Sequence, residues 1–136
     1  MNKKESVWID LYNALYIMSS KYKDIQHLES PVFDVFEELD TAIMNGLKDS
    51  NLALYFEEEW ITLTLYQEFK KFGEYINSIS SELWNESDFD KHPDWELARK
   101  WAVSLLSKIG EKKRGWDSTG DTIVFSEVNS KNIEEE

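Results

Sequence analysis

The residues best suited to chemistry in this sequence lie in an acidic stretch near position 90. Asp88, Asp90 and His92 alternate, and Asp94 follows them. Carboxylate oxygens and imidazole nitrogens bind divalent cations, so this spacing raises the possibility of a metal site. A calcium-binding EF-hand loop that began at Asp88 would need glycine at its sixth position and glutamate at its twelfth. Those positions hold proline and arginine, so the EF-hand pattern is absent.

Other catalytic and metal-binding patterns lack their required residues. Helical di-iron sites place glutamate three residues before each ligating histidine, but aspartate and phenylalanine stand there before His27 and His92. The absence of cysteine excludes thiolate zinc sites, cysteine nucleophiles and disulfides. No Gly-x-Ser-x-Gly elbow or Walker-type glycine pattern is present. The segment 117–121 has two carboxylates around Ser, Thr and Gly, which are the residues of a tight turn. We predict no cofactor, metal ligand or catalytic residue.

The net charge of -12 is concentrated in the middle of the sequence. Residues 31–98 carry sixteen acidic and four basic groups, a net of -12, whereas residues 99–120 carry six basic and two acidic groups, a net of +4. Phosphate contacts and anionic membrane surfaces require clustered Lys and Arg. The charge therefore argues against nucleic acid and against a membrane surface, and it favours a basic protein partner.

Acidic residues in this middle region occur in groups, and several groups contain an aromatic residue. Aromatic side chains supply affinity in protein interfaces, and charges raise the rate of association. We predict that the partner-binding residues are Glu37, Glu38, Asp40, Glu57, Glu58, Glu59, Trp60, Asp88, Phe89, Asp90, Asp94, Trp95 and Glu96. Two simpler interpretations remain open. The carboxylates are also typical of solvated helix faces, and Phe89 and Trp95 could form a hydrophobic staple at a helix start.

The elements that would position these residues are mostly helices. Apolar residues recur at three- and four-residue spacing over 6–22, 31–45, 52–72, 74–84 and 93–109. The β-branched, alternating residues of 122–128 predict a short strand or one arm of a hairpin. We therefore expect a mainly α fold, a bundle of four or five helices with a short C-terminal β-strand or hairpin. Residues 1–128 would form a single helical domain, and residues 129–136 a disordered acidic tail.

The predicted helix boundaries rest on residues that favour helix starts or helix ends. Ser30 and Pro31 predict the start of the second helix, and Asn45-Gly46 predicts its end through a left-handed residue. The segment 60–66 alternates Ile and Leu with Thr, as a strand would, but its context favours helix. Gly73 is expected to kink that helix or to end it.

The sequence favours an interaction protein over an enzyme. We expect an inhibitor or immunity-type protein that masks a basic partner such as a nuclease toxin. One alternative is a regulatory or assembly subunit that forms a homodimer through the C-terminal strand. Another is a small helical hydrolase or metal-dependent enzyme that uses Asp88, Asp90 and His92. No signal peptide or transmembrane run is evident, so the expected location is the cytoplasm.

Overall fold

The computed structural model describes residues 3–31 and 34–109 of the chain. In these ranges it has seven α-helices, two 3₁₀ turns and no β-strand, so the fold is mainly α. The elements are α1 (Lys3–Ser19), α2 (Tyr22–Ile25), η1 (Gln26–Leu28), α3 (Val35–Gly46), α4 (Asp49–Glu57), α5 (Leu63–Ser78), η2 (Ser81–Leu83), α6 (Glu86–Lys91) and α7 (Pro93–Lys108). The predicted four or five helices are too few, because the short helices α2 and α6 and the break between α4 and α5 were not foreseen; the helix predicted over 74–84 is not a separate α-helix, since residues 74–78 belong to α5. The predicted strand and tail lie outside the described residues.

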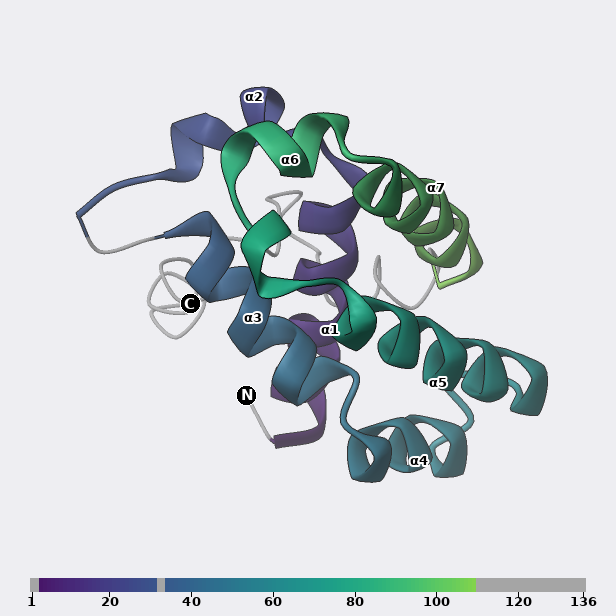
Figure 1. Ribbon diagram of the computed structural model, residues 1–136. Helices are drawn as coiled ribbons and strands as arrows, with labels where there is room; N and C mark the ends of the chain where they lie inside the picture. The colour runs from purple at the N-terminus through teal and green to yellow at the C-terminus, as the bar shows by residue number, and fades with distance from the viewer. Residues whose placement is uncertain (1–2, 32–33, 110–136) are drawn as a thin grey trace.

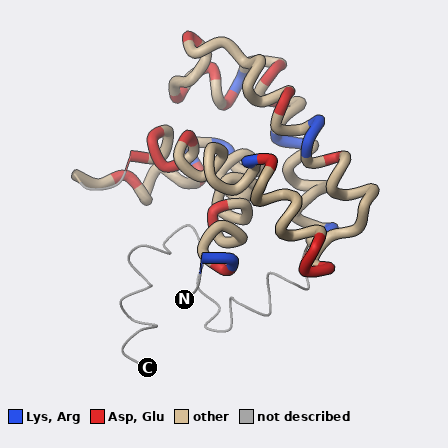
Figure 2. The backbone as a smooth tube through the Cα atoms, turned by 90° about the horizontal axis from the view of Figure 1, so that it is seen from below, with Lys and Arg blue, Asp and Glu red and all other residues tan. Residues whose placement is uncertain are grey.

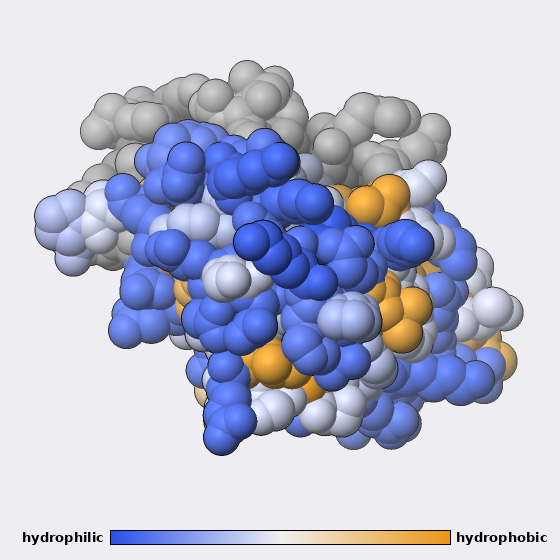
Figure 3. Space-filling model, turned by 45° about the horizontal axis from the view of Figure 1, so that its top comes forward, coloured by the Kyte–Doolittle hydropathy of each residue, from blue (hydrophilic) through white to orange (hydrophobic). Residues whose placement is uncertain are grey.

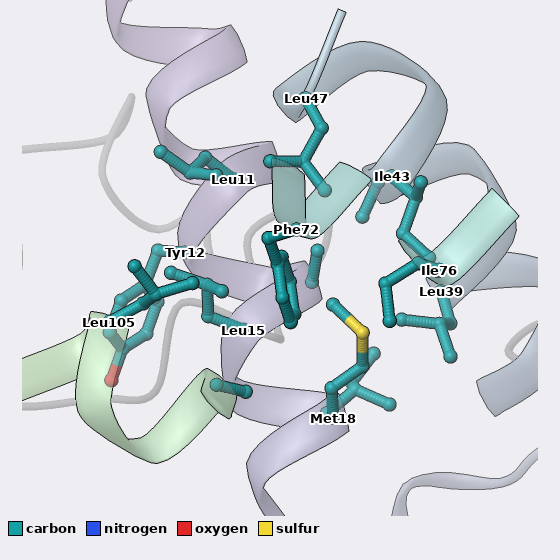
Figure 4. Close-up of a cluster of buried hydrophobic side chains, with 14 of the residues drawn as sticks. Leu11, Tyr12, Leu15, Met18, Leu39, Ile43, Leu47, Phe72, Ile76 and Leu105 are labelled. Atoms are coloured by element: carbon teal, nitrogen blue, oxygen red, sulfur yellow. The ribbon is translucent and has the colours of Figure 1, made fainter. Parts of the chain in front are cut away.

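Helix α1 lies at the centre of the molecule, with α3 and α7 packed closely against it (Figure 1). Between Val7 and Met18 this helix is almost entirely buried, which explains why its apolar residues occur around the whole circumference. Figure 4 shows Leu11 and Leu15 of α1 among side chains contributed by α3, α5 and α7. One continuous core therefore joins all the long helices.

The start of α3 differs from the predicted one. Asp34 is the N-cap, and its Oδ1 accepts hydrogen bonds from the backbone N–H groups of Phe36 and Glu37 at 2.9 and 3.0 Å. Helix therefore begins at Val35, whereas Ser30 and Pro31 precede it and are exposed. Aspartate and serine are both favoured N-cap residues, so Asp34 and Ser30 were competing signals for the start of this helix.

The end of α3 lies where Asn45-Gly46 predicted it, but for a different reason. Gly46 does not adopt the left-handed conformation. Instead, a Cβ atom at this position would lie 2.5 Å from both the Cα and the backbone nitrogen of Leu11 in α1. The Tyr55 hydroxyl of α4 lies 2.9 Å from the carbonyl oxygens of Gly46 and Val7, so it donates to the backbone of both helices. The glycine permits a backbone-to-backbone contact of α1 and α3.

The predicted continuous helix over 52–72 is wrong. Helix α4 ends at Glu57, and α5 begins at Leu63 after Thr62, whose side-chain oxygen accepts from the backbone N–H of Leu65 at 3.1 Å. The alternative of a strand over 60–66 is also excluded, because residues 63–66 are helical. Gly73 does not end a helix, since α5 continues through it to Ser78.

Helix α7 confirms the predicted start at Pro93, with His92 as its N-cap. Just before it, between the helices predicted over 74–84 and 93–109, lies the short helix α6, which is capped by Asn85 and was not predicted. Glu68 joins α7 to α5, because its carboxylate accepts from Trp101 Nε1 at 3.0 Å and from Lys108 Nζ at 2.8 Å. The Lys108 contact lowers the pKa of Glu68 below its usual value, although partial burial opposes this effect.

Gly46→Ala tests the close contact of α1 and α3. The added methyl group meets backbone atoms that cannot move aside singly, so we expect a loss of about 2 to 3 kcal/mol in the free energy of unfolding. Gly73→Ala is the matched control, because its Cβ would lie 3.8 Å from the Leu47 side chain, and it should be neutral or stabilising by up to about 1 kcal/mol. Urea unfolding of both variants checks this difference. Equal stability of the two variants would contradict the contact.

Glu68→Gln tests the link between α5 and α7 through its pH dependence. Because the folded-state pKa of Glu68 is lowered, its stabilising contribution is present above the unfolded-state pKa. That contribution is lost as pH falls through the lower, folded-state value. The variant should therefore be less stable than wild type near neutral pH, and the difference should shrink in acid. Urea midpoints measured from neutral to acid pH check this expectation; a constant difference would contradict it.

Candidate functional site

A groove lies between α3 and α5 and is lined by residues of both helices. It consists of two adjoining hollows of about 410 and 450 Å³ that share Asp40, Ile43 and Asn77 as lining residues. The groove exists because each helix is held by other neighbours. Helix α3 packs against α1, whereas α5 packs against α4 and α7. Neither helix fills the space beside the other, so their facing sides stay open.

The floor of the groove is apolar. Ile43 of α3 and Ile76 of α5 are both buried, and Leu47 closes the floor toward the start of α4. In Figure 4 the side chain of Ile76 points toward Leu39 and Ile43 of α3. At the edge, Met44 leaves 64% of its surface exposed, the highest value among the exposed large apolar side chains of the described residues. The groove thus offers apolar contact area at its bottom and on one side.

The two ends of the groove carry different charge. One hollow has Glu37 and Asp40 as its only charged lining residues among those described, beside Phe36 and Trp84. The other hollow is mixed, with Lys48 and Lys70 balancing carboxylates of α4 and α5. Glu37 and Asp40 are both exposed, so their charges face solvent. The groove therefore has an acidic end and an end where charges of both signs meet.

A second predicted group, Glu57, Glu58 and Glu59 with Trp60, forms the turn after α4. The N–H of Trp60 donates to the Tyr55 carbonyl at 2.9 Å, and the N–H of Glu59 donates to the Phe56 carbonyl at 3.0 Å. These two bonds define a Schellman helix end, in which Glu59 takes the left-handed position with φ of 63°. Glycine is preferred at this position, so a glutamate here is strained.

The charges of this turn are also unfavourably placed. Three carboxylates stand at the carboxyl end of α4, where the helix dipole favours cations. Lys4 of α1 offsets part of this, since its Nζ lies 3.2 Å from a Glu58 carboxylate oxygen. Trp60 is half-buried and packs edge-on against Trp8, with ring centroids 5.6 Å apart. The turn is exposed and acidic, but its aromatic residue largely faces the core.

The third predicted group, around α6 and the start of α7, is used within the fold. Asp88 accepts from the side-chain amide of Asn85 at 2.7 Å, and Asp90 accepts from the backbone N–H of Tyr22. Glu96 pairs with Arg99 at 2.9 Å. The Arg99 side chain also donates to the carbonyl of Ser20, so it links α7 to the end of α1. These carboxylates stabilise the packing of α6 and α7 on the core.

The residues proposed for the alternative of a metal-dependent enzyme also make hydrogen bonds within the fold. His92 Nδ1 accepts from the backbone N–H of Asp94 at 3.1 Å, which caps α7. The Asp88 carboxylate accepts from Asn85, the N-cap of α6, and Asp90 is directed at the backbone of α2. Within residues 3–31 and 34–109, no group of three His, Asp or Glu side chains is arranged to hold a metal ion. The alternation of Asp88, Asp90 and His92 in the sequence therefore reflects the successive starts of two helices, α6 and α7.

Phe89 and Trp95 require a correction of their predicted place. Both are buried, with 0% and 1% of their surface exposed, and their ring centroids lie 4.9 Å apart. Trp95 Nε1 donates to the carbonyl oxygen of Leu83 at 2.8 Å, so its only polar atom is satisfied inside the fold. The structure therefore has the staple-like packing of Phe89 on Trp95 that was the alternative interpretation of these two residues. Neither ring is exposed for contact with a partner.

The predicted acidic residues do not form one surface. Figure 1 places α4 at one end of the molecule and α6 at the other, so Glu57, Glu58 and Glu59 are far from Asp88 and Asp90. Figure 2 shows acidic positions spread over several helices, with fewer basic positions between them. The face toward α2 and α6 is mainly hydrophilic, with only small separate apolar areas (Figure 3). Of the predicted residues, only Glu37 and Asp40 line the α3–α5 groove.

Sequence reasoning missed the apolar half of the groove, although one signal was present. Ile43 and Met44 both belong to the apolar recurrence of the predicted helix over 31–45, yet adjacent residues of a helix point in directions about 100° apart. A narrow buried face therefore need not include both of them. The contributions of Ile76, Asn77 and Trp84 depend on how α5 lies relative to α3, which no local pattern specifies.

Comparisons with known proteins give no relative from which to transfer a function: no family model, no curated protein and no solved structure matches the chain. Among the described residues, no helix is long and apolar enough to cross a membrane. The groove is therefore interpreted from its own geometry.

Glu59→Gly tests the strain at the acidic turn. Removal of the side chain relieves the left-handed strain and takes one carboxylate from the carboxyl end of α4, so we expect stabilisation of about 1 kcal/mol. Glu58→Gly is the control, since Glu58 has an ordinary φ of -81° and pairs with Lys4; it should be destabilising. Urea unfolding of both variants measures the effect. A destabilised Glu59→Gly variant would show that the carboxylate contributes more than its strain costs.

Proposed function

We propose that this chain is an acidic protein-binding module that masks a basic partner, such as a nuclease toxin held by an immunity-type inhibitor. The observation that supports this most directly is the α3–α5 groove, where Glu37 and Asp40 border the apolar floor made by Ile43 and Ile76. Apolar contact slows the dissociation of a complex, and flanking charge adds specificity and speeds association. The groove combines both properties in one place.

The overall charge supports the same function. A net charge of -12 on a chain of 136 residues creates a negative field that attracts a cationic protein from beyond contact distance. The exposed residues Glu57 and Glu59 contribute to that field without touching the groove. In this scheme they steer the partner, and Glu37 and Asp40 make the contact. The carboxylates would take the positions on the partner that nucleic-acid phosphates occupy, which would block its active surface.

The double substitution Glu37→Gln/Asp40→Asn tests this scheme. Wild type used as bait should recover a basic protein from its native cell, and the purified pair then allows kinetic measurement. We expect association with the variant to be slower by about three- to tenfold at low salt, and the difference should shrink as salt screens the charges. Stopped-flow or surface-based kinetics over a salt series checks the result. A complex insensitive to salt, or the absence of any basic partner, would count against the proposal.

A matched control separates contact from steering. Glu57→Gln/Glu59→Gln removes the same two charges, so both double variants have a net charge of -10, which is -12 plus two. If the groove is the contact surface, the groove variant should also dissociate faster, whereas the turn variant should change only association. Equal effects of the two variants on dissociation would show that the groove is not the contact surface.

A further inference from the structure

The α3–α5 groove is long enough to hold a short helix. Its α3 side is lined by Phe36, Asp40, Ile43 and Leu47, which recur at three- and four-residue spacing along one helix face. From Phe36 to Leu47 this face extends about 17 Å at 1.5 Å per residue. The same length accommodates three turns of a second helix that lies along the groove.

The apolar floor and the charged ends indicate what that helix would carry. Ile43 and Ile76 would contact apolar side chains spaced i, i+4 and i+7, the pattern by which helices dock in grooves. Met44, exposed at the edge, extends this apolar contact, and methionine adapts to varied partners. Glu37 and Asp40 at one end favour Lys and Arg on the docked helix.

We propose that the groove binds a basic amphipathic helix of the partner protein, with the amino end of that helix toward Glu37 and Asp40. This inference rests on the proposed function and specifies the partner's shape. The direction follows from charge: the amino end of a helix carries partial positive charge and suits the hollow whose only described charged residues are Glu37 and Asp40, whereas its carboxyl end suits the hollow where Lys48 and Lys70 offset Asp49 and Glu74.

Other occupants fit the groove less well. An extended peptide adds to a sheet edge, and the described part of the chain offers no β-strand for it to join. A second copy of this chain would bring another acidic molecule of net charge -12 against the same end of the groove. A polyanion such as nucleic acid would be repelled by the same field. A cationic helix satisfies both the apolar floor and the charge.

Designed peptides of about 15 residues test the proposal on the intact protein. The helix probe has leucines at i, i+4 and i+7 and lysines on both flanks, and the control is the same peptide with one central residue outside these positions replaced by proline, which prevents helix formation. Fluorescence anisotropy measures their Kd values. We expect the helix probe to bind at least about tenfold more tightly than the proline control. Equal affinities would overturn the helix inference but leave the binding of basic partners intact, whereas binding of neither probe would count against the proposed function as well.

Two substitutions that add the same charge locate the binding. Met44→Glu adds a carboxylate to the groove edge, and Leu97→Glu adds one on α7; both side chains are largely exposed, at 64% and 52%. A contact that depends on charge alone would be tightened by both. A helix seated on the apolar edge should bind about fivefold more weakly to Met44→Glu and be unaffected or tightened by Leu97→Glu. Tightening by both substitutions would overturn the groove as the seat.

The direction of the helix has its own measurement. A nitroxide label at the amino end of the helix probe should broaden the indole N–H signal of Trp84, which lines the acidic end, more than the amide signals near Lys48. The reverse pattern would overturn the proposed direction. Broadening of neither end would place the peptide elsewhere and overturn the groove assignment.

Discussion

The approach of α3 to α1 at Gly46 is the contact on which the rest of the structure depends. A side chain at position 46 would overlap the backbone of Leu11, so the two helices meet at a distance that only glycine permits. Tyr55 then joins α4 to this contact, because its buried hydroxyl donates to carbonyl groups of both α1 and α3. Burial raises the pKa of Tyr55 above its usual value, with a smaller contribution from the charge of Asp10. The hydroxyl therefore remains protonated and available as a donor.

This contact also explains why a groove is present. Because α3 is fixed on α1 through one face, its opposite face with Asp40 and Met44 is turned outward. Helix α5 is fixed separately, through Glu68 to α7 and through Tyr75, whose hydroxyl donates to the Asp94 carbonyl at 2.8 Å. Two helices that are each held by other neighbours do not close on one another. The open space between them is thus a consequence of the packing, and its apolar floor is the edge of the core.

Local signals in the sequence predicted those parts of the fold whose causes are local. Pro93 with His92 gave the start of α7, because a helix start depends on the residues at that start. The break at Glu58–Thr62 was missed, since glutamate at a left-handed position is uncommon and Thr62 looked like part of an alternating pattern. Gly46 was noticed, but its cause lies in a residue 35 positions earlier, Leu11, and no local pattern contains that information. The groove was partly foreseen through Glu37 and Asp40, whereas its apolar side required the placement of α5.

The acidic residues of this sequence fall into two groups, those whose charge is explained by a neighbouring helix start and those whose charge is not. Asp34 caps α3 and Asp88 pairs with the cap of α6, so their charges are explained by the helix starts beside them. Glu59 has no such explanation, because both its backbone conformation and its charge oppose the local structure. Asp40 lies beyond the first turn of α3 and borders both hollows of the groove; Lys48 and Lys70 line one of them, and among the described residues no basic side chain lines the other. A carboxylate that stabilises its own helix needs no partner. Glu59 and Asp40 are carboxylates from which the fold gains little, and the cationic partner proposed above would account for their placement.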